Sequence, residues 1–350
     1  MIKVVTVDDS AFMRKAIQTM LEKDPGIKVV ATARNGQEGL EKVREHQPDV
    51  VTLDIEMPVM DGLTALRHIM MEMPRPVLMV SSLTTEGGEA TLKAMELGAV
   101  DFIPKQLSKV SLDIIKIEKD LQQKVRTVAR RRFRAPTARP AAKPEAPAAR
   151  AKKPEDRGKQ IRDIVAIGVS TGGPPAVQKV LALLPEKFPA SVLIAQHMPG
   201  AFTGPFAKRL DKVSNLTVME AVNGEKVQPG HAYIAPGGKH LAIDQKVSHI
   251  ELVVTDNPAD ALYKPSADVL ISSVAKGVGK RGLGVILTGM GSDGKDGIQQ
   301  LKSKGGRILA QSDSTCVVYG MPKAIVDAGL ADSVIDIEDM AQAITDGLFD

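Results

Sequence analysis

Residues 2–9 read IKVVTVDD, and residues 164–173 read IVAIGVSTGG. Each stretch is a short run of β-branched residues that ends in side chains able to do chemistry, and a helical pattern follows each. Similar runs recur along the chain, which predicts parallel sheets covered by helices, the doubly wound α/β class. The strands we expect are Ile2–Val7, Lys28–Ala33, Val50–Leu53, Val77–Val80 and Phe102–Ile103 in the first half, then Ile164–Val169, Val192–Ala195, Val285–Leu287 and Arg307–Ala310 in the second.

The helical patterns and one irregular region complete this expectation. Helices are predicted, for example, at Ala11–Lys23, Gly36–Glu45, Leu63–Met73 and Ala90–Leu97. A strand-rich stretch at about residues 217–255 interrupts the second block, and its Pro236-Gly237-Gly238 predicts the turn of a hairpin. We therefore expect two doubly wound α/β domains, one built on a five-stranded parallel sheet and one mainly parallel with an antiparallel hairpin.

A basic, proline-rich stretch separates the two blocks. Residues 124–160 hold thirteen Lys or Arg against three acids, a net charge of +10; because the whole chain carries +4, the remainder carries −6. Prolines from 136 to 154 block regular structure, so roughly 134–160 is expected to be a semi-extended linker. Our domain division is 1–122, a linker at 123–160, and 161–350. Besides a passive tether, the cluster Arg130–Arg134 leaves binding to nucleic acid or an acidic membrane open.

Composition excludes several classes of protein. Aromatic residues make up 3% of the chain and Trp is absent, which argues against a nucleic-acid reader built on stacked rings. A single Cys cannot form an intramolecular disulfide or a Cys-rich zinc site. The opening residues turn acidic at once, unlike a signal peptide, and no apolar run reaches the ~18 residues of a membrane span. We expect a soluble cytoplasmic protein without nucleic-acid partners or membrane insertion.

Charged and hydroxyl side chains follow the strands of the first block. They are Asp8 and Asp9, Asp54, Ser81 and Lys105. The carboxyl ends of parallel strands meet at one edge of a sheet, so these groups should lie together. Three carboxylates repel one another unless a divalent cation such as Mg²⁺ binds them, and a lysine and a hydroxyl nearby suit a phosphoryl group. Asp54 is then a candidate nucleophile that forms an acyl phosphate, whereas Asp8 or Asp9 could instead simply cap a helix.

The second block carries a hydroxyl, an imidazole and a carboxylate at the same kind of edge. Ser170 and His197 each follow a strand, and Asp293 lies just beyond Val285–Leu287. A serine hydrolase needs this set, because the imidazole takes the hydroxyl proton and the carboxylate holds the imidazole in the right tautomer. Glycines beside Ser170 and around Met290 let a substrate approach backbone N–H groups that stabilise an oxyanion. Taken singly, Ser170 and His197 also fit a helix N-cap and a core histidine.

Two literal motifs of the second block point elsewhere. Gly168-Val169-Ser170-Thr171-Gly172 fits the nucleophile elbow of α/β-hydrolases, but that fold orders its triad Ser, Asp, His, and no histidine follows His249. Such an enzyme would use Asp211 or Asp244 together with His231, His240 or His249. Gly289-x-Gly291-x-x-Gly294, with Asp313 beyond it, fits a dinucleotide-binding fingerprint but leaves Ser170 and His197 without a role.

The first block resembles the receiver domain of bacterial response regulators. The resemblance rests on Asp8-Asp9, on Asp54 in Leu53-Asp54-Ile55-Glu56-Met57-Pro58, and on Asp61-Gly62, Ser81 and Lys105. It implies a flavodoxin-like fold, phosphorylation of Asp54 by a chemotaxis histidine kinase, Ser81 and Lys105 as switch residues, and Mg²⁺ held by Asp8, Asp9, Asp54 and the backbone carbonyl of Glu56. One departure is Gln106, where receivers usually place Pro after the lysine.

Residues 160–350 resemble the catalytic domain of the chemotaxis protein-glutamate methylesterases, the CheB family. The matching strings are Gly168-Val169-Ser170-Thr171-Gly172-Gly173, Gln196-His197-Met198-Pro199, Ala235-Pro236-Gly237-Gly238 with His240, Pro265-Ser266-Ala267-Asp268-Val269-Leu270, Leu287 to Gly294, and Val317-Val318-Tyr319-Gly320-Met321-Pro322. In this order behind a receiver, they are specific.

That resemblance implies roles for individual residues. Ser170 is the nucleophile, His197 the general base, Asp293 its orienting partner, the Met290 N–H an oxyanion donor, and Thr171 the nucleophile's neighbour. Pro265 to Asp268 carries ordinary helix-start signals, so we assign it structure, as we do His240.

The implied reaction is hydrolysis of glutamate γ-methyl esters on chemoreceptors, activated by phosphorylation and without a cofactor for the ester chemistry. Deamidation of receptor glutamines is a secondary expectation. The competing hypothesis is a receiver-controlled binding module, or a dinucleotide-binding output domain, without esterase activity.

Overall fold

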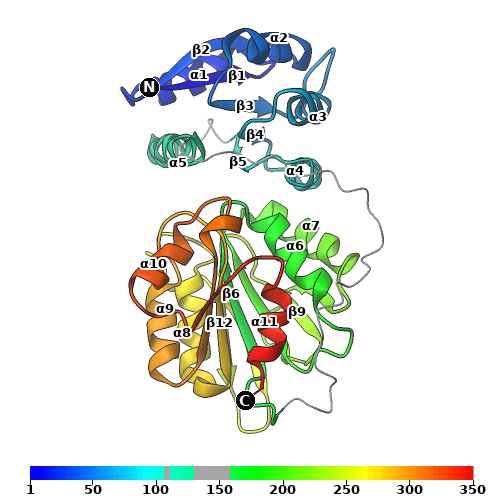
Figure 1. Cartoon of the computed structure of the whole chain (residues 1–350), viewed down its shortest axis with the longest axis vertical. Coiled ribbons are helices and arrows are strands. Elements are labelled where there is room, and N and C mark those ends of the chain that lie inside the picture. Colours follow the sequence, from blue (N-terminus) through cyan, green and yellow to red (C-terminus); the bar gives the residue numbers. More distant parts are fainter. Residues whose placement is uncertain (106–110, 130–157, 350) are drawn as a thin grey trace. The chain divides into compact units, whose positions relative to one another are not determined.

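The computed structural model describes residues 1–105, 111–129 and 158–349, and the chain divides into two compact units, Met1–Pro140 and Ala141–Asp350 (Figure 1). Each unit has its own sheet and its own apolar core. Within the described ranges, every helix is too short or too polar to cross a bilayer.

The first unit contains a five-stranded parallel sheet in the order β2-β1-β3-β4-β5. Helix α1 contacts α5, whereas α2 contacts α3 and α3 contacts α4, so the helices form two separate groups. The order confirms the flavodoxin-like fold expected from the sequence. The elements are β1 (Ile2–Val7), α1 (Ala11–Glu22), β2 (Ile27–Ala33), α2 (Gly36–His46), β3 (Val50–Asp54), α3 (Gly62–Glu72), β4 (Val77–Ser81), α4 (Thr85–Glu96), β5 (Asp101–Pro104) and α5 (Ser111–Ala129).

Short polar side chains start the helices of this unit. Ser10, Asn35, Asp61 and Thr84 each accept a hydrogen bond from a backbone N–H in the first turn of the helix that follows. Such caps satisfy amide groups that have no partner inside the helix. Because Ser10 caps α1, Asp8 and Asp9 remain available to the sheet edge, and the helix-cap alternative for them is wrong.

Two helix boundaries differ from the sequence prediction. Helix α4 begins at Thr85, not at Ala90, because the Thr84 cap outweighs the two glycines of its first turn. Helix α5 continues to Ala129, with Val125 and Val128 buried in the core of the first unit. Residues 123–129 are therefore helical and packed instead of linker, and the expected linker at 130–157 and Gln106 lie outside the described residues.

The second unit contains a seven-stranded parallel sheet in the order β14-β13-β12-β6-β7-β9-β8. Strands β6 and β7 are buried along their whole length, as their apolar sequences predict. The elements are β6 (Ile164–Val169), α6 (Gly173–Leu183), β7 (Ser191–Gln196), α7 (Gly200–Asp211), β8 (Thr217–Glu220), β9 (His231–Ile234), β10 (His240–Gln245), β11 (Ile250–Thr255), α8 (Ala267–Gly277), η2 (Gly279–Arg281), β12 (Gly282–Ile286), α9 (Lys295–Ser303), β13 (Arg307–Gln311), η3 (Asp313–Thr315), α10 (Met321–Asp327), β14 (Ser333–Ile335) and α11 (Met340–Gly347).

The antiparallel hairpin is present, but its turn is not at Pro236-Gly237-Gly238. Strands β10 and β11 pair antiparallel from His240↔Thr255 to Gln245↔Ile250, and the turn lies between them. The strand before the glycines, β9, joins the parallel sheet next to β7 instead. Pro236 to Gly238 therefore carry the chain out of the sheet into the hairpin, a tertiary choice that the turn-forming residues do not reveal.

Candidate functional site

Three neighbouring strands of the second sheet carry the predicted triad. Ser170 directly follows β6, His197 directly follows β7, and Asp293 lies in the loop between β12 and α9. Strand β6 pairs with β12 on one side and with β7 on the other, at a spacing of about 4.8 Å per strand. The sheet order therefore brings the three side chains together at one carboxyl edge, where ligands bind in open α/β sheets.

The turn that carries Ser170 leaves no room for a side chain at Gly172 or Gly173. Gly172 has φ +76°, and a Cβ there would lie 2.4 Å from Cβ of Val317. A Cβ on Gly173 would lie 2.0 Å from Oε1 of Gln196. The amide of Gln196 in turn donates to the carbonyl oxygens of Ser170 (3.1 Å) and His197 (3.2 Å). The two glycines thus let the nucleophile turn pack closely, and Gln196 ties it to the backbone of His197.

His197 connects the hydroxyl to the carboxylate. Its Nδ1 lies 3.1 Å from Oγ of Ser170, and its Nε2 lies 2.7 Å from Oδ2 of Asp293. An ionised carboxylate only accepts hydrogen bonds, so the neutral imidazole carries its proton on Nε2 and offers the Nδ1 lone pair to Ser170. The structure therefore brings all three predicted side chains into one hydrogen-bonded series.

Asp293 lies at the N-terminus of α8. Its Oδ1 accepts from Oγ of Ser266 (2.8 Å) and from the N–H of Asp268 (3.1 Å), and its Oδ2 accepts from the N–H of Ala267 (2.7 Å). Burial alone would raise the pKa of Asp293, but the hydrogen bond from His197 and these backbone donors outweigh it and lower the pKa to about 2. The carboxylate is ionised wherever the protein is folded at moderate pH.

Asp268 makes the reciprocal contact. It belongs to the first turn of α8, and its Oδ1 accepts from the N–H of Gly297 (2.8 Å) in the first turn of α9. Burial and the nearby Asp293 raise the pKa of Asp268 to about 6. The N-terminus of α8 thus binds the carboxylate of Asp293, just before α9, and the N-terminus of α9 binds the carboxylate of Asp268 in α8. These two contacts fix the loop that carries Asp293.

Sequence reasoning missed how three residues support this site. Ser266 was assigned to structure alone, yet its hydroxyl holds Asp293. The ring of Tyr263 stacks on His197, with centroids 4.2 Å apart and planes 13° from parallel. His240, which is fully buried, bonds the N–H of Ser266 through Nδ1 (3.3 Å) and the carbonyl of Pro258 through Nε2 (3.2 Å). The only sequence signal for His240 and Ser266 was that both lie in strings that match the CheB family. Tyr263 gave no signal in the sequence.

Thr171 and Met290 lie beside the nucleophile. Thr171 is buried, and its carbonyl accepts from the hydroxyl of Thr288 (2.9 Å). Met290 follows Gly289, where a Cβ would lie 2.9 Å from Cβ of Ser170. The loop after β12 therefore runs against Ser170, which is where an oxyanion donor must be.

The acids of the rival triads, Asp211 and Asp244, lie elsewhere. Asp211 accepts from the N–H of Val218, and Asp244 pairs with Lys246 at the hairpin. Gly294, the last glycine of the dinucleotide-like motif, has φ +95° and is the N-cap of α9. That glycine-rich loop thus serves to place Asp293 and α9, and its motif needs no bound dinucleotide.

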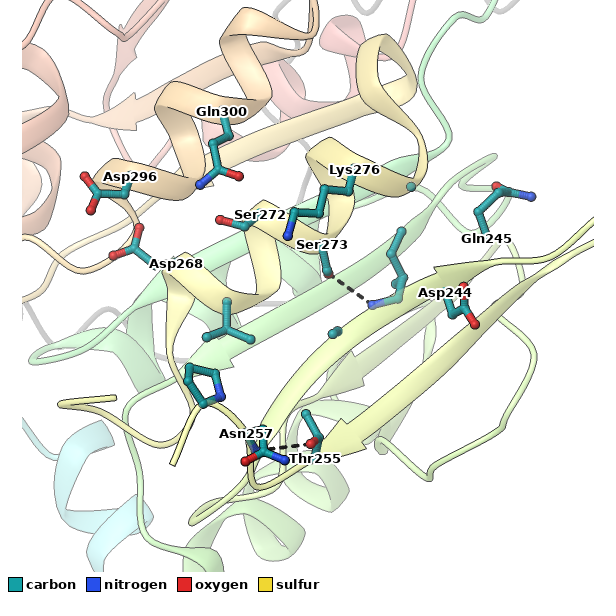
Figure 2. A pocket seen from close by; sticks show the side chains of 15 residues that line it. Asp244, Gln245, Thr255, Asn257, Asp268, Ser272, Ser273, Lys276, Asp296 and Gln300 are labelled. Carbon is teal, nitrogen blue, oxygen red and sulfur yellow. Dashed lines mark hydrogen bonds between the residues drawn. The ribbon is translucent and has the colours of Figure 1, made fainter. Parts of the chain in front are cut away.

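A separate groove lies between the hairpin and helices α8 and α9 (Figure 2). Its labelled polar side chains include Lys276 and Ser272 of α8, Gln300 of α9 and Asp244 of β10. Asp268 lines the groove as well, but Ser170, His197 and Asp293 do not. The groove is therefore distinct from the triad.

The first unit brings together most of the predicted phosphorylation site. Nζ of Lys105 lies 2.6 Å from Oδ2 of Asp54 and 3.2 Å from Oδ2 of Asp8. Burial raises the pKa of Asp54 to about 6; Lys105 opposes the rise and the Asp8 charge adds to it. Ser81 and Glu56 line the same small pocket as Asp54 and Lys105. The five predicted residues, which come from the ends of four strands, therefore meet at one edge.

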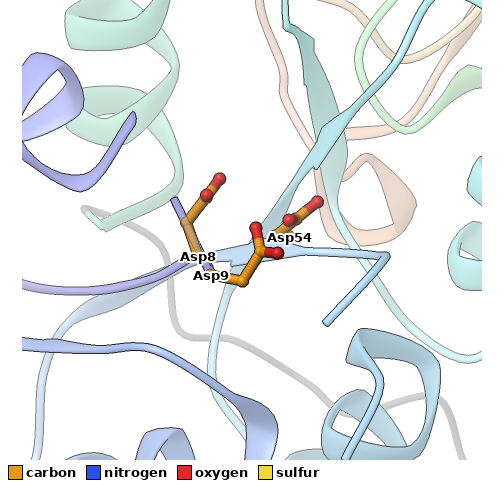
Figure 3. Close-up of side chains that lie close together, drawn as sticks. All are labelled: Asp8, Asp9 and Asp54. Carbon is orange, nitrogen blue, oxygen red and sulfur yellow. The ribbon is translucent and has the colours of Figure 1, made fainter. Parts of the chain in front are cut away.

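The carboxylates of Asp8, Asp9 and Asp54 gather closely enough to hold a cation, with one oxygen of each within 4.8 Å of the others (Figure 3). The positive charge of a divalent cation would offset the desolvation and the like-charge repulsion that raise the pKa of Asp54. Oxygen ligands of this kind are those that Mg²⁺ prefers. The residues present therefore fit Mg²⁺.

The hydroxyl of Ser81 is engaged on the α4 side of the pocket. It lies 3.2 Å from the carbonyl of Gly87 and accepts from Oγ1 of Thr91 at 2.8 Å. To reach a group on Asp54, Ser81 would have to leave these partners.

Comparison with known proteins agrees with this geometry. The profile of the CheB methylesterase family matches residues 165–344, just over half of the chain. The chain belongs to the CheB methylesterase family. A response regulator receiver domain matches residues 4–115. Both resemblances inferred from the sequence are confirmed.

Similar proteins match the chain over its full length or over part of it. The chain is 68% identical to protein-glutamate methylesterase/protein-glutamine glutaminase 2 of Nitratidesulfovibrio vulgaris, and 54% identical to the protein-glutamate methylesterase/protein-glutamine glutaminase of Lawsonia intracellularis, in each case across 100% of both chains. The crystal structure of the Thermotoga maritima CheB methylesterase catalytic domain superposes with a TM-score of 0.51 at 38% identity, covering 53% of this chain and 97% of that one.

Proposed function

We propose that the chain hydrolyses glutamate γ-methyl esters on methyl-accepting chemoreceptors, and that phosphorylation of Asp54 activates it. The hydrogen-bonded series Ser170–His197–Asp293 is the observation that carries the proposal. The names of full-length relatives support the substrate class. The proposal extends to glutamine side chains, and it locates the reaction in the cytoplasm.

The reaction begins at Ser170. Its Oγ bonds to the ester carbonyl carbon while its proton passes to Nδ1 of His197. The negative charge of Asp293, held next to Nε2, stabilises the imidazolium that results. The backbone N–H of Met290 stabilises the developing oxyanion, and preorganised donors of this kind contribute about 3–4 kcal/mol each elsewhere.

The same groups complete the turnover. His197 gives its proton to the leaving methoxide, which departs as methanol and leaves an acyl ester on Ser170. Water then attacks the acyl carbon as His197 takes one of its protons. Collapse releases the glutamate carboxyl group and returns the proton to Oγ of Ser170. With a glutamine substrate, ammonia leaves in place of methanol.

The first unit controls this chemistry through Asp54. In the proposal a chemotaxis histidine kinase supplies the phosphoryl group. Asp8, Asp9, Asp54 and the Glu56 carbonyl would hold Mg²⁺, which would supply charge neutralisation for the transfer. The ammonium of Lys105, already 2.6 Å from Asp54, contacts the added phosphoryl oxygens. Ser81 follows by exchanging its bonds near α4 for one to the phosphoryl group.

The deciding experiment measures methanol release from a methylated receptor fragment. We compare the wild type, Ser170→Ala and Asp54→Asn, each with and without a small phosphodonor plus Mg²⁺. Ser292→Ala, an exposed serine in the loop that carries Asp293, is the matched control. We expect donor-stimulated release by the wild type and Ser292→Ala, unstimulated release by Asp54→Asn, and none by Ser170→Ala.

Other results have distinct meanings. Equal release by the wild type and Ser170→Ala would remove Ser170 as nucleophile. No release by any variant would shift the weight to a binding module, with NAD binding as the next assay. For deamidation, intact-mass analysis of a glutamine-bearing fragment should show conversion of amide to acid by the wild type only.

A further inference from the structure

We propose that Leu262, Tyr263 and Val317 form a docking rim that seats the aliphatic side chains of a protein substrate beside Ser170 and His197. The inference rests on the proposed function and names the part of the site that selects a protein over a small ester. It concerns side chains that take no part in bond making or breaking.

The docking rim flanks the catalytic residues. Tyr263 stacks on His197, and the next side chain, Leu262, is 85% exposed. Val317 packs against Gly172, two residues after the nucleophile, and is 37% exposed. Exposed aliphatic groups next to a catalytic site mark a surface that a partner covers, because water contact is unfavourable for them.

The loop that displays Leu262 is anchored at both ends. His240 bonds the carbonyl of Pro258 before Leu262 and the N–H of Ser266 after it. The carbonyl of Lys264 also accepts from the N–H of Gly238 (3.1 Å). Because the loop is held in place, covering Leu262 costs little ordering entropy, which favours a docking role over a mobile surface loop.

The two lysines near Leu262 are engaged within this part of the fold. Nζ of Lys264 donates to the carbonyl of Asp256 (3.0 Å), and Nζ of Lys239 lies 3.6 Å from the Asp256 carboxylate. The Leu262 side chain itself offers a partner apolar contact, and the exposed carboxylate of Asp260 lies two residues before it. The occupant is the segment that carries the ester, with aliphatic side chains beside it, because that segment must lie next to Tyr263 and Val317 when the ester reaches Ser170.

The test compares two substrates of the full-length protein. We measure kcat/KM for a methylated receptor fragment and for a small activated ester, in the wild type, Leu262→Ser, Leu262→Met and the control Val247→Ser. Val247 is fully exposed at the hairpin turn and belongs to neither the triad nor the docking rim. The ratio of the two constants separates docking from catalysis, because a general defect lowers both and leaves the ratio unchanged.

We expect Leu262→Ser to lower the ratio about tenfold, mainly through KM for the receptor fragment, because the apolar contact of a buried leucine is lost. Leu262→Met should restore most of it, and Val247→Ser should leave it at the wild-type value. A wild-type ratio in Leu262→Ser overturns the inference while leaving the proposed function standing. Altered sedimentation of Leu262→Ser would reassign the docking rim to self-association. Loss of wild-type ester hydrolysis would overturn both.

Discussion

Replacing Asp293 by Asn tests how the carboxylate works. An amide can occupy the site in two orientations. With its nitrogen at the Oδ2 position it would face the N–H of Ala267 and force the proton of His197 onto Nδ1, towards Ser170. With its nitrogen at the Oδ1 position it faces the longer N–H contact of Asp268 and can donate to Oγ of Ser266. The second orientation has the weaker conflict and keeps the catalytic tautomer.

The expected loss is therefore the charge interaction alone. Two unit charges about 4 Å apart interact by about 4 kcal/mol at an effective dielectric constant of about 20. Removing the anion next to the imidazolium should lower kcat by about 10³-fold. A wrong tautomer in a serine hydrolase costs about 10⁴-fold, which is a distinguishable result.

The assay is methanol release under single-turnover conditions, together with nitrogen NMR of the His197 ring. Asp296→Asn, an exposed acid three residues away, is the control and should match the wild type. A loss of 10⁴-fold or more with the ring protonated on Nδ1 would refute the orientation argument. A loss below about tenfold would refute the role of the charge.

Three further predictions follow from contacts in both units. Asp54→Asn should stabilise the unphosphorylated protein by up to about 3 kcal/mol at pH 8. The pKa of Asp54 is raised from 3.8 to about 6, so the stability of the wild type falls as pH rises through that range. Denaturant titration should show that the gain shrinks towards pH 4, and a pH-independent gain would contradict the prediction. Thr91→Val removes a hydrogen-bond donor to Ser81. Because one hydrogen bond is worth about 1 kcal/mol, it should lower about fivefold the concentration of beryllofluoride, a phosphoryl mimic, that half-activates methanol release. An unchanged concentration would mean that Thr91 does not restrain Ser81. Gly173→Ala should slow phosphonate labelling of Ser170 at least about tenfold, because the new Cβ displaces Gln196. Adding Gln196→Ala should recover part of the rate, and no recovery would mean that the clash with Gln196 is not the cause.

The alternation of strands and helices was readable from the sequence because its causes are local. Buried parallel strands require β-branched runs such as Ile164–Val169, and these runs also place Ser170 and His197 at one edge. The turn at Pro236 to Gly238 was misread for the opposite reason. Turn-forming residues indicate a change of direction, whereas the partner of the next strand depends on the rest of the fold.

The supporting contacts of the triad could not be read in the same way. Ser266 looks like an ordinary N-cap, and it is one, but the carboxylate that it holds comes from a loop 27 residues later. Tyr263 touches His197 only because the hairpin and α8 bring the loop between them back to the sheet edge. Such pairings depend on tertiary placement, which a single sequence does not encode in any local pattern.

The exchange of carboxylates between α8 and α9 has a consequence for biosynthesis. Ser170 and His197 leave the ribosome first, and the first turn of α8 follows, but Asp293 arrives 26 residues after Ala267. A nascent or truncated chain therefore holds a serine and a histidine without the anion that makes them a catalyst. Full hydrolytic competence requires the carboxyl-terminal half of the sheet, so unfinished chains should hydrolyse esters far more slowly than the complete protein.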